Sequence, residues 1–473
     1  MLFIKRNKWI LIILLVAAFL RFYNLGFSSF WFDEANVAFA ATQPTLSQAV
    51  KATHLSVASM PLDYIILWFM ARFSQAEGWL RIPEALWGIA AVGILFLFAR
   101  QVAGRTIAHL SALFLALAQV HIYFSQELRF YAPLFFFYWL NTWLFFRAQK
   151  EPSRRNWILV IEAAIIGAYI HFYTLFAFFN GLVFILLFSR WRTTWKVFFI
   201  SAMITGLCVL PGFLIFGLST PMPDLSMFAN PLLPELSKAL GWSSITGNLA
   251  GNILGAVFLF LALTGLVAAI LRRRWVLVGL TASIAVQIGI LVVMDVLARY
   301  FFVTRTFLFA LPITFLLAGY ALQTLVHAPE GPQLSSFHIS ITRPLAGFIL
   351  AGLVGLSLLT YIQNQPIQKS NAHPISAYLH EAWQPGDQVW VNPAYDPFTF
   401  LFYLDVYFKD DRMIDIMKGY SWSDLPNPGE TRDKIFLITQ RLGPEDVKSL
   451  EIRGFERIQD LSGPSWLWVR SAS

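Results

Sequence analysis

The sequence is poor in cysteine and in charge. Its one cysteine, Cys208, excludes a disulfide within the chain, so cysteine usage does not indicate a redox compartment. Charged residues make up 13% of the 473 residues and hydrophobic ones 57%, which excludes an ordinary water-soluble globular protein. The sequence also lacks a Walker loop, a glycine-rich dinucleotide fingerprint, a cysteine pair and a G-x-S-x-G elbow. Nucleotide-driven chemistry therefore has no support.

Long apolar runs are abundant instead, with 45 phenylalanines and 17 tryptophans in the chain. This composition is typical of a polytopic membrane protein, whose solvent is lipid over most of its length. The net charge of +8 does not indicate nucleic-acid binding, because much of the lysine and arginine lies in short clusters between apolar runs. Such clusters mark cytoplasmic loops. We expect membrane lipids, and no nucleic acid, among the partners.

Eleven segments are apolar and long enough to be interpreted as membrane spans. Every second connection between them is basic, apart from residues 327–341, so the positive-inside rule places the N-terminus in the cytoplasm. An odd number of spans then places the C-terminus on the external or periplasmic side of the plasma (inner) membrane. The predicted spans are residues 8–26, 83–100, 105–121, 129–147, 157–172, 175–190, 195–217, 250–271, 275–297, 304–326 and 342–362.

One apolar segment, residues 60–73, is left out of this count. It is short and contains Asp63, and a span here would place the later basic clusters outside the cell. We interpret it as a helix in the outer interface, which makes residues 27–82 one long external loop. The transmembrane domain is then predicted to cover residues 1–362.

Beyond residue 362 the pattern changes from apolar runs to short alternating segments. The sequence predicts a helix at 373–383, a turn at 384–387, and strands at 388–392, 434–439 and 465–470. We therefore expect residues 363–473 to form a small external α/β domain. The predicted fold class is an α-helical polytopic membrane protein with about eleven transmembrane helices and this C-terminal domain.

Asp33 and Glu34 stand side by side in an aromatic setting just after the first span. Neighbouring carboxylates that repel each other and lose hydration have a raised pKa in at least one of them, which suits a general base. The alternative is structural, with Asp33 as the N-cap of a helix and Glu34 favoured by the helix dipole. Both interpretations can hold at once, since a cap also positions a catalytic residue.

Three arginines, Arg81, Arg129 and Arg305, are placed on the same outer side by the predicted topology. Guanidinium groups match phosphate geometry, so they are candidates for binding the phosphate of an anionic lipid carrier. The alternative for each one is a side chain that reaches from a span end to the lipid headgroups. Three arginines with two acids on one face favour a binding site.

Tyr131, His171 and Tyr173 fall on this side as well, and we take them as candidate substrate-binding residues. A histidine among aromatic residues at the interface is also common as a purely structural, hydrogen-bonded group. The histidines show no compact metal-ligand spacing. We therefore expect no metal and no other cofactor, and a divalent metal has no support.

Several short motifs follow one another in order along the chain. After Asp33 and Glu34 come "MPLDYIILW" (60–68), "RIPEALWGIAAV" (81–92), "SQELRFYAP" (125–133) and "RTFLFALP" (305–312). Over residues 1 to about 326 this order resembles the family 39 glycosyltransferases of the GT-C class, with the protein O-mannosyltransferases and the aminoarabinose transferases of lipid A. The chain has "SMPLDY" where that family commonly has "HPPLYY" or "KPPLYY", so the family's histidine or lysine is missing here.

The resemblance implies a GT-C-like fold and transfer of a sugar from a polyprenyl-phosphate-linked donor at the external membrane surface, with inversion at the sugar carbon. Asp33 matches the family's base and Glu34 the acid beside it, and Arg81, Arg129 and Arg305 match arginines near the active site or the donor phosphate. The acceptor is expected to be a lipid, a protein or a polysaccharide.

Two other functions remain open from the residues alone. A polytopic lipid or sugar transporter or flippase would carry charged residues and broken helices near the middle of its spans. A non-catalytic carbohydrate-binding membrane protein would use the aromatic external loops for binding only. The gathering of polar residues on one face favours surface chemistry over transport.

Overall fold

The structure is a computed structural model that describes residues 2–53, 60–217, 232–298, 303–326, 335–365, 368–392, 402–403, 416–418, 434–440, 442–459, 461 and 463–471. The chain divides into two compact units, each described here by itself. Unit 1 comprises Met1–Tyr23, Thr53–Ile66 and Arg81–Gln365, and unit 2 comprises Asn24–Ala52, Leu67–Leu80 and Pro366–Ser473.

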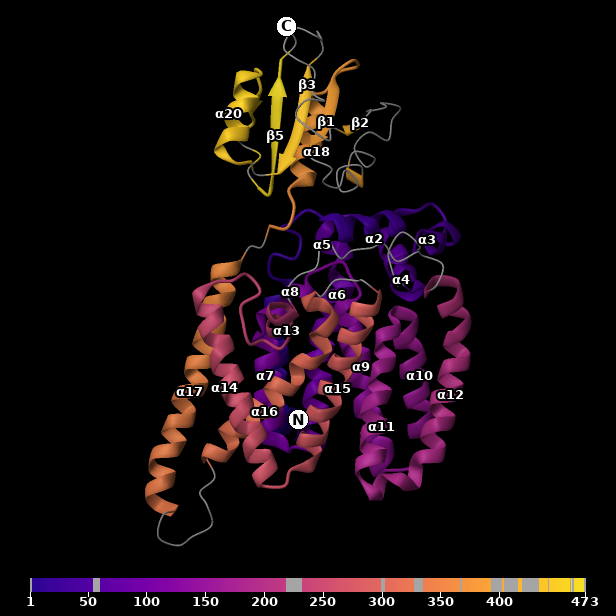
Figure 1. Ribbon diagram of the computed structural model, residues 1–473, viewed down its shortest axis with the longest axis vertical. Coiled ribbons are helices and arrows are strands. Elements are labelled where there is room, and N and C mark those ends of the chain that lie inside the picture. Colours follow the sequence, from indigo (N-terminus) through magenta and orange to yellow (C-terminus); the bar gives the residue numbers. More distant parts are fainter. Residues whose placement is uncertain are drawn as a thin grey trace. The chain divides into compact units, whose positions relative to one another are not determined.

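Unit 1 is a bundle of long helices whose axes run side by side (Figure 1). Short 3-10 helices η2 (Phe172–Phe176), η3 (Ser189–Thr194) and η6 (Thr304–Ala310) and a π-helical turn η4 (Phe213–Gly217) connect or extend them. Its α-helices are α1 (Leu2–Phe22), α4 (Pro61–Ala71), α6 (Ile82–Val102), α7 (Arg105–Leu117), α8 (Gln119–Ser125), α9 (Tyr131–Lys150), α10 (Arg154–Ile170), α11 (Ala177–Leu187), α12 (Trp195–Gly212), α13 (Leu232–Ala239), α14 (Leu249–Leu271), α15 (Trp275–Ala298), α16 (Leu311–Val326) and α17 (Ser335–Asn364).

A helix lies at each of the eleven predicted spans. Among the described residues, six helices are long and apolar enough to cross a membrane, or seven if the bent pair α7 and α8 counts as one span. The protein is thus mainly helical with several membrane-crossing helices, and the count of eleven stays a prediction. Helix α4 has 11 residues and is about 16 Å long, so it is too short to cross, in agreement with its interpretation as an interfacial helix.

The helices at the centre and at the edge of the bundle differ in what surrounds them. The most apolar stretch of the helical segment Thr304–Val326 is 78% buried inside the protein, whereas that of Arg343–Asn364 is 28% buried. Gly265 of α14 lets the central helix α16 approach closely, because a Cβ there would collide with the Leu317 carbonyl. Small residues at helix contacts are the usual way to pack helices in lipid, where the hydrophobic effect between helices is absent.

One group of neutral polar side chains lies inside the bundle, between α9, α11 and α15. Asn180 donates to Tyr138 (2.9 Å) and to Thr142 (3.0 Å), and its carbonyl oxygen accepts from Ser283 (2.7 Å) and Gln287 (3.0 Å). Tyr138 in turn donates to Gln287 over 2.9 Å. These five residues are called the Asn180 network below. Each buried polar group has a partner on a neighbouring helix, so the network joins three helices without a buried charge.

Helix α14 ends in a Schellman motif. The backbone N–H of Arg274 donates to the carbonyl of Ala269 (2.7 Å), and Arg273 lies between them with a positive φ of 54°. This left-handed position favours glycine, and a residue with a Cβ costs about 1–2 kcal/mol there. The chain nevertheless has an arginine at this position.

Unit 2 joins parts of the first loop to the C-terminal part of the chain. It contains α2 (Phe32–Thr42), α3 (Leu46–Ala52), α5 (Glu77–Leu80), α18 (Ala372–Ala382) and α20 (Pro444–Ile452). The Phe30 N–H donates to Tyr403 (2.7 Å), and the Glu77 carboxylate contacts His373 (2.5 Å) and accepts from Tyr403 (2.8 Å). The loop and the C-terminal segment therefore form one packed body, although 296 to 373 positions separate the residues in contact.

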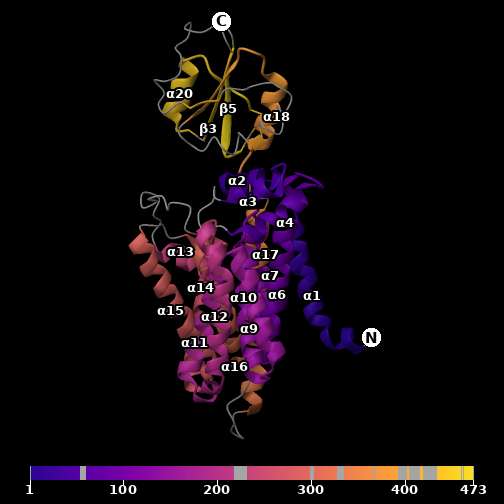
Figure 2. The ribbon, with the colours of Figure 1, turned by 90° about the vertical axis from the view of Figure 1, so that its right-hand side faces the viewer.

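The sheet of unit 2 has five strands in the order β2-β1-β3-β5-β4. β1 pairs in parallel with β2 and β3, and β5 pairs antiparallel with β3 and β4. Figure 2 shows α18 and α20 on either side of β3 and β5. Three strands fall on the segments predicted as strands; the five are β1 (Gln388–Asn392), β2 (Ile416–Lys418), β3 (Ile435–Gln440), β4 (Glu456–Arg457) and β5 (Ser465–Arg470).

Candidate functional site

The segment that carries Arg129 follows a break between α7 and α8, which are bent by 60° relative to each other. The last carbonyls of α7 have no partner within the helix. The buried guanidinium of Arg21 on α1 donates to two of them, Leu115 (3.2 Å) and Ala116 (3.1 Å), and also to His121 Nδ1 (2.8 Å) on α8. Arg21 thus fixes the bend and the direction in which α8 leads to Arg129.

Gln126 holds the other end of α8. Its side-chain amide donates to the carbonyls of Leu20 (3.3 Å), Arg21 (3.2 Å) and Tyr23 (2.9 Å) at the C-terminus of α1. The end of α7 is therefore satisfied by Arg21 of α1, and the end of α1 by Gln126 at the C-cap of α8. The "SQELRFYAP" motif is anchored to α1 directly before its arginine.

Arg129 and Arg305 approach the same aromatic ring from distant parts of the sequence. The guanidinium carbon of Arg129 lies 5.8 Å from the Tyr131 ring centre and 4.8 Å from that of Phe130. The guanidinium carbon of Arg305 lies 5.6 Å from the Tyr131 ring centre. A guanidinium over an aromatic face keeps its planar edge available for an oxyanion. The structure therefore brings three predicted site residues together.

Glu235 on α13 fixes the start of η6, one residue before Arg305. Its carboxylate accepts from the backbone N–H (2.7 Å) and the hydroxyl (2.5 Å) of Thr304, and it pairs with Lys238 (2.8 Å). Burial opposes ionisation of Glu235, but the hydrogen bonds from Lys238 and Thr304 outweigh it and lower its pKa. The carboxylate is thus ionised at neutral pH and anchors the turn that carries Arg305.

Three buried acids lie near Arg129 inside unit 1. Glu84, in the first turn of α6, interacts electrostatically with Asp63, Glu127 and Arg129. Burial raises the pKa of Asp63 to about 6, although Glu84 and the Arg129 charge act in the opposite direction. Asp63 therefore titrates near pH 6, beside the Arg129 charge. Asp63, Glu84, Glu127, Arg129, Tyr131 and Arg305 are called the Arg129 cluster below.

His171 and Tyr173 lie next to this cluster, at the turn from α10 into η2. The Tyr173 N–H donates to His171 Nδ1 (3.2 Å), so the neutral ring carries its proton on Nε2. The buried His171 ring packs 4.4 Å from Phe130 and 4.8 Å from Tyr173, between ring centres. This arrangement accounts for a structural role, and substrate binding by these two residues stays a prediction.

Asp33 and Glu34 are in unit 2, in the first turn of α2. The N-cap of this helix is Trp31, so the alternative that Asp33 is the N-cap is wrong. Glu34 is buried and accepts from the Trp31 N–H over 3.4 Å, so Glu34 supplies the capping contact that reaches back to the helix start. Asp33, half-buried, stays a candidate for chemistry.

Arg81 is buried at the N-cap position of α6, one turn before Glu84. Among the described residues, no group of three or more histidine, cysteine, aspartate or glutamate side chains is arranged to hold a metal ion.

Comparison with known proteins gives a match to a family model over part of the chain. Residues 59–216 match the family model described as dolichyl-phosphate-mannose-protein mannosyltransferase. A Bacillus subtilis protein named "Putative mannosyltransferase YkcB" is 27% identical over 161 residues, which are 32% of this chain. The chain spans 22% of the length of that curated relative.

The solved structures agree over almost the whole chain. ArnT from Cupriavidus metallidurans in the apo state covers 98% of both chains, with a TM-score of 0.59 and 12% identity. The fold is that of the GT-C glycosyltransferases. The same ArnT bound to undecaprenyl phosphate covers 99% of both chains (TM-score 0.57, 13% identity). The Archaeoglobus fulgidus oligosaccharyltransferase tethered with an acceptor peptide covers 92% of this chain and 69% of its own (TM-score 0.54, 12% identity). The predicted resemblance is confirmed.

Within this GT-C fold the matched family segment contains much of the Arg129 cluster but not all candidate residues. Arg81, Arg129 and His171 lie inside residues 59–216, whereas Asp33 and Arg305 lie outside them.

Sequence reasoning missed the acids that lie near Arg129. Asp63 was used above as an argument against a span, and neither Asp63 nor Glu84 was assigned a role in the site. The available signal was a single acid in each of two otherwise apolar motifs, "MPLDYIILW" and "RIPEALWGIAAV". An isolated acid in such a setting is costly to bury and therefore points to a partner.

Proposed function

We propose that this GT-C protein is a glycosyltransferase that moves a sugar from a polyprenyl-phosphate-linked donor to an acceptor at the external face of the plasma membrane. The observation that carries the proposal is the convergence of Arg129 and Arg305 on the Tyr131 ring, beside buried acids. Guanidinium groups suit a phosphate, and carboxylates suit sugar hydroxyls. A sugar phosphate needs both.

Two of the structural relatives support the type of donor. One ArnT structure is bound to undecaprenyl phosphate, and the Archaeoglobus fulgidus enzyme AglB was solved with a dolichol-phosphate and an inhibitory peptide. Both ligands are lipid phosphates that remain after a sugar has left. For this chain we propose a lipid, protein or polysaccharide acceptor.

The proposed reaction is a single displacement. Asp33 takes the proton from the acceptor hydroxyl or amine, whose oxygen or nitrogen attacks the sugar carbon from the face opposite the phosphate. The bond from that carbon to the phosphate oxygen breaks, so the sugar carbon is inverted. Arg81, Arg129 and Arg305 bind the phosphate as its negative charge grows, and Glu34 orients the helix that carries the base.

The decisive experiment compares lipid-linked sugars and surface glycans, by mass spectrometry, between cells with the wild-type protein and cells with Asp33→Asn. Removal of a general base should lower transfer by at least about a hundredfold, and a polyprenyl-phosphate sugar should accumulate. Asp33→Glu keeps the carboxylate and serves as the matched control. Normal transfer with Asp33→Asn would remove Asp33 from this role.

The same variant separates the two other functions. A carbohydrate-binding protein without catalysis should keep its ligand and its phenotype when Asp33 becomes asparagine. A transporter would depend on polar groups deep in the bundle, but the Asn180 network is neutral and its groups bond to one another. Substitution there should leave a surface enzyme active, and loss of function would favour transport.

A further inference from the structure

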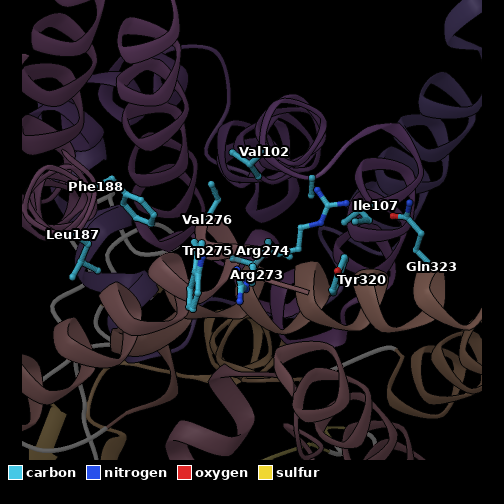
Figure 3. Close-up of a pocket in the computed structure, with 12 residues that line it drawn as sticks. Val102, Ile107, Leu187, Phe188, Arg273, Arg274, Trp275, Val276, Tyr320 and Gln323 are labelled. Atoms are coloured by element: carbon cyan, nitrogen blue, oxygen red, sulfur yellow. The ribbon is translucent and has the colours of Figure 1, made fainter. Parts of the chain in front are cut away.

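A pocket lies at the end of the unit 1 bundle where α6 ends. It has a volume of about 520 Å³ and is lined by the ends of α6, α7, α11, α15 and α16. Figure 3 shows Leu187 and Phe188 at one end, Tyr320 and Gln323 at the other, and Arg273 and Trp275 between them. The pocket is therefore apolar at one end and polar at the other, with Arg273 between them.

This pocket is separate from the Arg129 cluster. Helix α6 contributes Glu84 to the cluster near its first residue and Val102 to the pocket at its last. At 1.5 Å per residue the two positions are roughly 27 Å apart along the helix axis, close to the thickness of a bilayer core. The pocket thus lies at the end of the bundle where the sequence predicts basic, cytoplasmic connections.

The arginines of the pocket are positioned by the end of α14. Arg273 occupies the left-handed position of the Schellman motif, where glycine would be favoured, and Arg274 follows it. Both side chains line the pocket and are exposed. A strained residue other than glycine beside a cavity favours a role for its side chain.

The lining also shows how a ligand would enter. Leu187 and Trp275, at the ends of the apolar helices α11 and α15, are 60% and 50% exposed. Tryptophan is common at the depth of the lipid headgroups. In a bilayer, these exposed apolar side chains would border the acyl chains, and the neighbouring arginines would lie nearer the headgroups.

We propose that this pocket binds the phosphate headgroup of an anionic phospholipid. Arg273 and Arg274 would hold the phosphate, Tyr320 and Gln323 would hydrogen-bond the polar part of the headgroup, and Leu187 and Trp275 would contact the first acyl carbons. The proposal is independent of the glycosyl-transfer reaction, because it concerns binding at the opposite end of the helices.

The test measures lipid binding to the purified full-length protein by native mass spectrometry and by thermal shift. Phosphatidylglycerol should raise the melting temperature, and phosphatidylcholine should not. Arg274→Gln should weaken phosphatidylglycerol binding about tenfold. Arg272→Gln is the matched control, because it removes the same charge from the same turn but does not line the pocket; its binding should change less than about twofold.

Arg273→Gly gives a test that does not depend on folding defects. Glycine relieves the backbone strain, so the melting temperature without anionic lipid should rise while the gain from phosphatidylglycerol falls.

Equal losses of phosphatidylglycerol binding in Arg272→Gln and Arg274→Gln would show general attraction of a basic surface and overturn the proposal. Displacement of phosphatidylglycerol by soluble glycerol phosphate, or tighter Arg274-dependent binding of undecaprenyl phosphate, would overturn it as well.

Discussion

The two buried polar regions of unit 1, the Asn180 network and the Arg129 cluster, differ in the kind of polar groups they bury. In the Asn180 network every group is neutral and bonds to a group on another helix, as a polar group inside a membrane protein must. The Arg129 cluster instead gathers acids and guanidinium groups, with Asp63 titrating near pH 6. A structure that only needed stability would not need these charges.

The difference indicates what each region is for. A closed neutral network joins helices and leaves little hydrogen-bonding capacity for a ligand. A cluster of charges costs free energy to bury, and a charged substrate can recover that cost on binding. Substitutions in the two regions should therefore separate stability from catalysis.

Among substitutions in these two regions, Arg129→Ala should give the largest effect on activity. Loss of a charge-assisted contact to phosphate, about 2–3 kcal/mol, corresponds to a fall in kcat/KM for the lipid-phosphate donor of about 30- to 160-fold. Steady-state kinetics in detergent or nanodiscs checks this, with Arg129→Lys expected to lose less because it keeps the charge. Arg100→Ala, at the other end of α6, is the control. Unchanged donor kinetics in Arg129→Ala would mean that Arg129 contacts lipid headgroups and does not bind the donor phosphate.

Asp63→Asn should change the dependence of stability on pH. The pKa of Asp63 is raised from 3.8 to about 6 in the folded protein, so the favourable contribution of its protonated form is present below pH 3.8 and is lost as pH rises through about 6. Above pH 6 the buried carboxylate costs up to about 3 kcal/mol. The variant should therefore melt higher than the wild type at pH 7.5 and nearly the same at pH 4. A difference of equal size at both pH values would contradict the assignment.

Asn180→Ala should affect stability but not chemistry. It removes four hydrogen bonds and leaves the Ser283 hydroxyl without its acceptor, at a cost of about 1–2 kcal/mol. The melting temperature should fall by a few degrees, while kcat/KM of the folded fraction stays within about twofold. Thr142→Val, which removes one of these bonds, should give a smaller fall. A large kinetic defect would mean that the network contributes to function.

Glu235→Gln should give the smallest effect of the four. The amide still accepts from Thr304 but without the carboxylate charge, so η6 and Arg305 are held less firmly. KM for the donor should rise about threefold with kcat nearly unchanged. Lys238→Gln removes the ion pair but keeps both Thr304 contacts, and it should behave like the wild type. A defect in Lys238→Gln of the same size would show that the ion pair, not the Thr304 contacts, is responsible.

Much of this architecture follows from the sequence. Apolar runs of bilayer length predict helices without any knowledge of packing, because a backbone in lipid has to satisfy its own hydrogen bonds. Alternation of apolar and polar residues likewise predicts the strand at 388–392, since side chains of a strand point to opposite faces in turn. The arginines of the motifs are also visible in sequence, because charge is rare in such a chain.

Only the tertiary structure shows which distant residues meet. Arg129 and Arg305 share the Tyr131 ring, and Asp63 lies beside Glu84, through helix packing that no local pattern encodes. The N-cap of α2 is Trp31 rather than Asp33, because Glu34 reaches back to the helix start. Local hydrophobicity determines where helices form, whereas side-chain contacts between helices determine which charges are buried together, and a buried charge acquires its chemistry from its neighbours.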